Sequence, residues 1–115
     1  MTSSKQEQIS TMSAFEKALD ESANAKYTLR LYITGLTPRS TRAIANLKAI
    51  CEQHLNGRYE LEVIDVNQQP EMAQRDQIIA VPTLIKHLPL PMHRIIGDLS
   101  DTDRVLVGLR LKMQE

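Results

Sequence analysis

The clearest periodic pattern in the chain lies over residues 27–34, where apolar and polar residues alternate in YTLRLYIT. Side chains of a strand point alternately to opposite faces, so this period of two predicts a β-strand with one apolar face. A second strand is predicted over residues 59–66, where Ile64 and Val66 make the other face partly apolar too. A strand that is apolar on both faces suits the interior of a sheet covered by helices.

Between these strands the apolar residues recur every three and four positions, which predicts a helix. Thr37 is placed to cap this helix, and Pro38 stands at its first position, where a missing N–H costs no hydrogen bond. Asn56-Gly57 suits the left-handed conformation that ends many helices. A helix of about 18 residues is long enough for a right-handed crossover between parallel strands. The first half is therefore predicted to be a β-α-β unit.

The next stretch predicts shorter elements. A short helix is expected over residues 69–76, an apolar approach to a strand over residues 78–85, and a short strand over residues 93–96. With a final helix, this order is that of a thioredoxin fold, in which Val81-Pro82 forms the cis-proline step facing the first helix. The pattern therefore predicts an α/β domain.

The last segment, residues 101–112, has two interpretations. Ser100 and Asp103 have the spacing of a capping box, which predicts a helix. The same residues alternate as a strand would, and Gly108 costs a helix interior about 1 kcal/mol relative to alanine. Both interpretations stay open at this point.

The first 26 residues are polar and are expected to form an extension outside the core, with the domain proper over residues 27–115. Within the extension, Ser13 and Glu16 have capping-box spacing, which indicates a short helix. The apolar residues that share one face of that helix are Met12, Phe15 and Leu19.

Composition narrows the classes of function. The 115 residues suffice for one domain with one core, and 14 basic residues balance 14 acidic ones. Zero net charge gives no electrostatic reason to expect a nucleic-acid duplex or an anionic membrane as partner. No apolar run approaches the length of a membrane span, and no secretory signal is recognisable, so we expect a cytoplasmic protein.

Catalytic and metal chemistry find little support in the sequence. A dithiol oxidoreductase needs a thiolate at the start of the first helix, where this chain has Thr37 and Ser40. The single cysteine, Cys51, can form neither an internal disulfide nor a cysteine-based zinc site, and its place on the apolar helix face predicts core packing. The histidines lack metal-site spacing and are expected at the surface; they are His54, His87 and His93.

A basic edge is formed by residues 84–96, which carry no acid. It is interpreted either as a solvated loop or as a contact surface for an acidic partner. Its charged and titratable residues are Lys86, His87, His93 and Arg94.

Several motifs together resemble the KaiB family of circadian-clock proteins. They are GLTPRS at residues 35–40, LEVIDV at 61–66, AVPTL at 80–84 and, most specific of all, RIIGDLSDTDRVLVGL at 94–109. The similarity extends over roughly residues 27–111. It implies a regulator without enzymatic activity or cofactor, which binds the ATPase ring of a hexameric KaiC-type protein. A KaiA-like protein and a SasA-like histidine kinase are further candidate partners.

The resemblance also implies two folds for one chain. The resting state has the order β-α-β-β-α-α-β and forms a homodimer or homotetramer, while a thioredoxin-like monomer with the order β-α-β-α-β-β-α binds KaiC. Because subunit contacts favour the resting state by mass action, we expect residues 105–111 to form a strand. Arg110 opposes this expectation, since a cation in the last turn of a helix is favoured by about 0.3–1 kcal/mol.

Two sets of residues carry these roles by resemblance. The partner-binding set consists of Arg30, Arg42, Tyr59, Lys86 and Arg94. The fold-switch set consists of Pro82, Pro89, Pro91, Gly97, Gly108 and Arg110. An alternative function is a redox-inactive thioredoxin-like protein of stress or thiol metabolism that binds glutathione without catalysing exchange.

Overall fold

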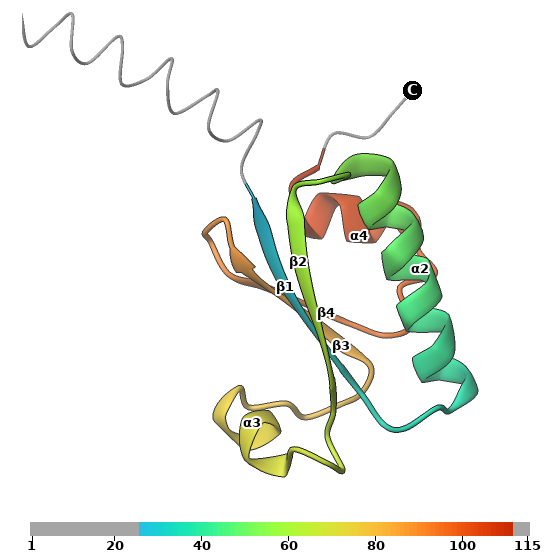
Figure 1. Ribbon diagram of the computed structural model, residues 1–115, viewed down its shortest axis with the longest axis vertical. Helices are drawn as coiled ribbons and strands as arrows, with labels where there is room; N and C mark the ends of the chain where they lie inside the picture. Colours follow the sequence, from blue (N-terminus) through green and yellow to red (C-terminus); the bar gives the residue numbers. More distant parts are fainter. Residues whose placement is uncertain (1–25, 112–115) are drawn as a thin grey trace, which may run out of the picture.

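A computed structural model describes residues 26–111, which form a mixed four-stranded sheet with helices on both of its faces (Figure 1). Along the chain the elements are β1 (Tyr27–Ile33), α2 (Pro38–His54), β2 (Tyr59–Asp65), α3 (Pro70–Arg75), β3 (Thr83–Leu88), β4 (His93–Ile96) and α4 (Thr102–Gly108).

The strands follow the order β2-β1-β3-β4 across the sheet. β1 and β2 run parallel and are joined by α2, so the predicted β-α-β unit is confirmed. β3 runs antiparallel to both β1 and β4. The α/β class and the thioredoxin-like fold are thereby confirmed, and the element order is the second of the two that the resemblance implied.

The expectation of a strand over residues 105–111 is wrong for this structure, because α4 occupies most of that segment. Asp101 caps the helix, since its Oδ1 accepts a hydrogen bond from the Arg104 N–H at 3.2 Å. The predicted cap, Ser100, therefore lies one residue too early. Burial of Val105 and Leu106 against the sheet outweighs the local preferences that left this segment undecided.

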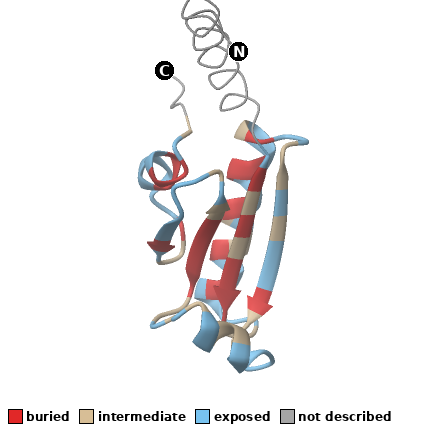
Figure 2. Ribbon diagram, turned by 90° about the vertical axis from the view of Figure 1, so that its left-hand side faces the viewer, coloured by how far each residue is buried: buried red, intermediate tan, exposed pale blue. Residues whose placement is uncertain are grey.

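Each face of the sheet has its own apolar cluster. The larger one lies under α2 and α4 and includes Leu31, Leu47 and Leu84, each fully buried. The smaller one lies on the α3 side and centres on Tyr32 and Ile64. Figure 2 shows buried residues along the middle strands and on the side of α2 that faces them, while the residues of the edge strand β2 are exposed or half-buried except for Ile64. The face under α2 and α4 is therefore the main core.

The segment before β3 fits the predicted apolar approach to a strand over residues 78–85. Residues 78–82 form the loop that leads into β3, which begins at Thr83. The Val81-Pro82 peptide bond is cis, as predicted. The helix predicted around Ser13 and Glu16 lies outside the described residues. None of the helices between residues 26 and 111 has the length and apolar character needed to cross a membrane.

Candidate functional site

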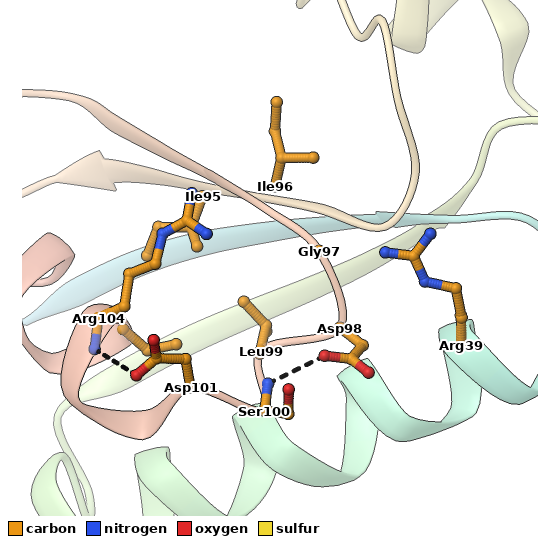
Figure 3. Close-up of a pocket in the computed structure, with 10 residues that line it drawn as sticks. Arg39, Ile95, Ile96, Gly97, Asp98, Leu99, Ser100, Asp101 and Arg104 are labelled. Carbon is orange, nitrogen blue, oxygen red and sulfur yellow. Dashed lines mark hydrogen bonds between the residues drawn. The ribbon is translucent and has the colours of Figure 1, made fainter.

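A cavity of about 280 Å³ opens between the start of α2 and the loop that joins β4 to α4 (Figure 3). The loop is residues 97–101, the centre of the most specific sequence motif. Gly97 has φ +121°, a conformation that side chains disfavour, and its N–H donates to the Pro82 carbonyl at 2.9 Å. Leu99 has φ +64° and its side chain is buried. The motif therefore folds into a defined wall of the cavity.

Asp98 ties this loop to α2. Its Oδ2 accepts a hydrogen bond from Arg42 Nε at 3.2 Å, and its carbonyl accepts one from Asn46 Nδ2 at 2.9 Å. Its Oδ1 accepts the Ser100 N–H at 3.1 Å. Hydrogen bonds from Ser100, followed by the one from Arg42, lower the pKa of Asp98. Sequence reasoning missed Asp98 and Asn46, because their partners lie more than 50 positions away in the chain.

At the start of α2, hydroxyl groups occupy the positions where a dithiol oxidoreductase carries its thiols. Thr37 Oγ1 accepts the Ser40 N–H at 3.2 Å, and Ser40 Oγ accepts the Thr34 N–H at 3.1 Å. Ser40 is only 1% exposed, so its hydroxyl serves this local network. Cys51 is fully buried, and burial raises the pKa of its thiol to about 12. At neutral pH it is therefore a protonated core side chain, as predicted.

Arg30 belongs to an ion network on the α3 side of the sheet. Its Nη1 lies 2.9 Å from Asp76 Oδ2 and its Nε lies 3.1 Å from Glu62 Oε1. The Tyr32 hydroxyl donates to the same Asp76 carboxylate. Burial, reinforced by Asp76, raises the pKa of Tyr32 to about 12. Burial alone would raise the pKa of Asp76, but the hydrogen bonds from Tyr32 and Arg30 outweigh it and lower that pKa.

Lys86 is placed differently from its prediction as a partner-binding residue. It is 1% exposed and lies on β3 between Leu29 of β1 and His93 of β4. Because β3 is a central strand, alternate side chains on it point into the main core. Burial, followed by the nearby charge of Arg110, lowers the pKa of the Lys86 ammonium. In this fold Lys86 is a core residue and contributes to no exposed surface.

The two histidines of the basic edge lie in different environments. His93 is exposed, as predicted. His87 departs from the prediction, because its Nε2 is buried and, within the described part of the chain, has no hydrogen-bond partner. His87 lies at the register shift between β1 and β3, where no β1 residue pairs with it.

The remaining predicted contact residues do not share one face. Arg94 is exposed and lies opposite Ile85, on the α3 side of the sheet; its Nη1 contacts the Gln77 carbonyl at 3.4 Å. Arg42 lies on α2, on the other side, with 56% of its side chain exposed. Tyr59 is half-buried at the start of the edge strand β2. The structure thus brings Arg30 and Arg94 to one side of the sheet and Arg42 to the other.

Gly108 lies close to β4, at the end of α4. A Cβ atom at this position would lie 2.7 Å from Ile95 Cδ1 and 3.0 Å from His93 Cδ2. These separations are shorter than van der Waals contact, so glycine lets the helix pack directly on β4. Of the other residues predicted to take part in fold switching, Pro82, Pro89 and Pro91 all follow cis peptide bonds.

Arg110 lies beyond the end of α4, whereas the prediction placed it in the last helical turn. Its φ is +58°, in the left-handed region. The Arg110 N–H donates to the Val107 carbonyl at 3.0 Å, and the Leu111 N–H donates to the Leu106 carbonyl at 2.8 Å. These are the two hydrogen bonds of a Schellman motif, whose left-handed position usually holds glycine. Arg110 therefore carries a conformational cost in this fold.

No group of three or more histidine, cysteine, aspartate or glutamate side chains within residues 26–111 is arranged to hold a metal ion. The features that the structure does gather are the cavity beside the loop, the clamp of Asp98 on α2 and the ion network of Arg30. Charged hydrogen bonds of this kind stabilise the fold or bind a charged group of a partner.

Comparison with known proteins identifies the family. The family model of the KaiB domain matches residues 30–111. The circadian clock oscillator protein KaiB of Nostoc punctiforme is 53% identical over 93 residues, which cover 81% of this chain and 89% of that protein. The protein of the same name from Prochlorococcus marinus subsp. pastoris is also 53% identical over 93 residues, covering 81% and 87%.

Solved structures support the same fold. The N-terminal domain of Synechococcus elongatus SasA matches with a TM-score of 0.62 at 22% identity, covering 79% of this chain and 90% of that domain. Mitochondrial thioredoxin 3 from Saccharomyces cerevisiae matches with a TM-score of 0.61 at 13% identity, covering 84% and 90%. The sequence matches extend over most of the described domain, and the chain belongs to the KaiB family.

Proposed function

We propose that this protein is a non-enzymatic regulator in a circadian clock or a clock-related system, and that it acts by binding a KaiC-type hexameric ATPase. The observation that carries the proposal is the 53% identity to circadian clock oscillator proteins over 81% of the chain. The fold shared with the N-terminal domain of SasA supports a SasA-like histidine kinase as a further partner or competitor. A KaiA-like protein completes the set of proposed partners.

The proposed contact surface centres on Arg94. This side chain is exposed, and its contact with the Gln77 carbonyl at 3.4 Å is long for a hydrogen bond. It is therefore free to pair with a carboxylate of the partner. Arg42 is a second candidate, but its guanidinium already holds Asp98. Its effect on binding is expected to come partly through the position of the loop.

Refolding of the C-terminal half between an oligomeric resting state and the thioredoxin-like state is the second part of the proposal. Two observations support it. Residues 101–112 have the pattern of a helix and of a strand. In addition, the thioredoxin-like fold holds Arg110 in a left-handed conformation and Lys86 in the core. Both placements cost free energy, so these two residues of the C-terminal half destabilise the thioredoxin-like state.

The test is the affinity for a purified KaiC-type hexamer, measured by biolayer interferometry at low and high salt. The wild-type protein is expected to bind. Arg94→Glu is expected to weaken binding about tenfold at low salt and less at high salt, because salt screens the exposed pair. Arg75→Glu makes the same change of charge on exposed α3 and serves as the matched control. Absence of wild-type binding, or equal losses for both variants, contradicts the proposal.

Arg42 needs a separate control, since its replacement also releases the loop. Asn46→Ala removes the other α2 hydrogen bond to Asp98 without changing the charge. If Arg42 contacts the partner directly, Arg42→Gln weakens binding more than Asn46→Ala does. Equal losses for the two variants would assign Arg42 to positioning of the loop.

A further inference from the structure

Two arginines face the cavity beside the loop from opposite walls. Arg39 extends from α2 and Arg104 from α4, and Figure 3 shows their guanidinium groups on either side of Gly97. Among the residues that the structure describes, neither Arg39 nor Arg104 forms an ion pair. The cavity is therefore flanked by two guanidinium groups that form no direct ion pair with its carboxylates.

The carboxylates that also line the cavity are engaged elsewhere. Asp98 bonds Arg42 Nε and the Ser100 N–H, and Asp101 accepts the Arg104 N–H as the cap of α4 (Figure 3). Both carboxylates thus satisfy other donors and leave the two guanidinium groups available. Their negative charge also limits how tightly an anion is held, so we expect an affinity in the millimolar range.

We propose that this cavity binds an oxyanion, a phosphate or carboxylate group, between the guanidinium groups of Arg39 and Arg104. A guanidinium presents its N–H donors in a fork that matches the paired oxygens of these groups. The volume of about 280 Å³ compares with about 30 Å³ for one water in the liquid, so the cavity admits a phosphate group together with several waters.

Occupancy of the site has a structural consequence. Arg39 belongs to α2 and Arg104 to α4, so an anion between them joins the first half of the domain to the C-terminal helix. A ligand that binds only the folded arrangement stabilises it in proportion to its occupancy. Oxyanions of this class therefore favour the thioredoxin-like state. This site does not depend on the proposed binding of an ATPase, and either can fail without the other.

Inorganic phosphate is the probe, titrated into the full chain while amide chemical shifts are followed by NMR. Sodium chloride at matched ionic strength is the reference. We expect saturable shifts confined to the amides of residues 97–104 and the start of α2, with a rise in melting temperature. Arg39→Gln and Arg104→Gln are each expected to weaken binding at least fivefold. Arg75→Gln, which removes an exposed cation from α3, is expected to leave binding unchanged.

Acetate in a parallel titration separates the two sources of the oxyanion. Saturation by both anions assigns the site to oxyanions in general, and saturation by phosphate alone restricts it to phosphoryl groups. Shifts that do not saturate, that chloride reproduces or that persist in both arginine variants overturn the proposal. Arg39→Lys and Arg104→Lys guard against a folding defect, because they keep the charge and remove only the fork; they are expected to retain part of the affinity.

Discussion

The first and second halves of the domain are built on different kinds of contact. In β1, α2 and β2, the local sequence accounts for each element: alternation makes the strands, and Thr37 with Pro38 starts the helix. In β3, β4 and α4, the decisive contacts come from distant residues. The loop is held by α2 through Asp98, and the Tyr27 hydroxyl donates to the Leu109 carbonyl at 2.8 Å. The second half takes its shape largely from the first.

The length of α4 explains this dependence. It has seven residues, and an isolated helix of that length is not stable in water. Burial of Val105, Leu106 and Leu109 against the sheet supplies what local preference lacks. A segment with weak local preference and strong distant contacts is one in which a few substitutions can shift the balance of states.

The largest expected effects come from deleting core side chains in each half. Leu47 and Leu109 are both fully buried, and Leu→Ala at such positions typically costs about 2–5 kcal/mol. Leu47→Ala is expected to lower amide protection from hydrogen exchange throughout the domain. Leu109→Ala is expected to release α4 first and to leave β1 and α2 protected. Hydrogen exchange followed by NMR measures both. Uniform loss of protection in Leu109→Ala would remove the distinction between the halves.

The same distinction explains what the sequence could predict. The bounds of β1, α2 and β2 were predictable within about two residues, because their signals lie within the segments themselves. The choice between helix and strand for residues 101–112 was not, because burial against the sheet decides it. Lys86 was misplaced for a related reason: its charge indicates the surface, and only the strand order shows that β3 is central.

A smaller effect is expected from the buried cation of the second half. Lys86→Met keeps the length of the side chain and removes a charge that burial and Arg110 disfavour. We expect it to stabilise the described fold by about 1–2 kcal/mol at pH 7, as measured by urea unfolding. Arg94→Met on the exposed neighbouring strand is the control and is expected to change stability by less than about 0.5 kcal/mol. A loss of stability in Lys86→Met would show that its ammonium finds a favourable partner.

The pH dependence of unfolding stability in the wild type and in Lys86→Met tests whether Lys86 is the buried titrating group. Because the folded-state pKa of Lys86 is lowered, the unfolded chain binds more protons between that pKa and the ordinary value of 10.5. Wild-type stability therefore rises through this window relative to Lys86→Met. Tyr32, with its pKa raised to about 12, has the opposite effect, but it is present in both proteins and cancels in the difference.

The smallest expected effect concerns Gly108, where a local and a distant contribution oppose each other. Alanine in a helix is favoured over glycine by about 1 kcal/mol, which favours α4. The new Cβ would meet Ile95 Cδ1 at 2.7 Å, so the isoleucine must move before that gain is realised. Ile95→Val removes the Cδ1 atom and with it the nearest obstacle. Gly108→Ala alone is therefore expected to stabilise the thioredoxin-like state by clearly less than it does in the Ile95→Val background.

A double-mutant cycle by urea unfolding separates the two contributions. In the Ile95→Val background, Gly108→Ala should recover part of the propensity gain of about 1 kcal/mol, because the close contact with His93 Cδ2 at 3.0 Å remains. In the wild-type background the gain should be smaller by the cost of shifting a buried side chain, about 0.5–1.5 kcal/mol for one forced off its preferred rotamer. The difference between backgrounds measures how strongly β4 restrains α4. If Gly108→Ala has the same effect in both backgrounds, the Ile95 side chain moves without measurable cost and its Cδ1 atom does not restrain α4.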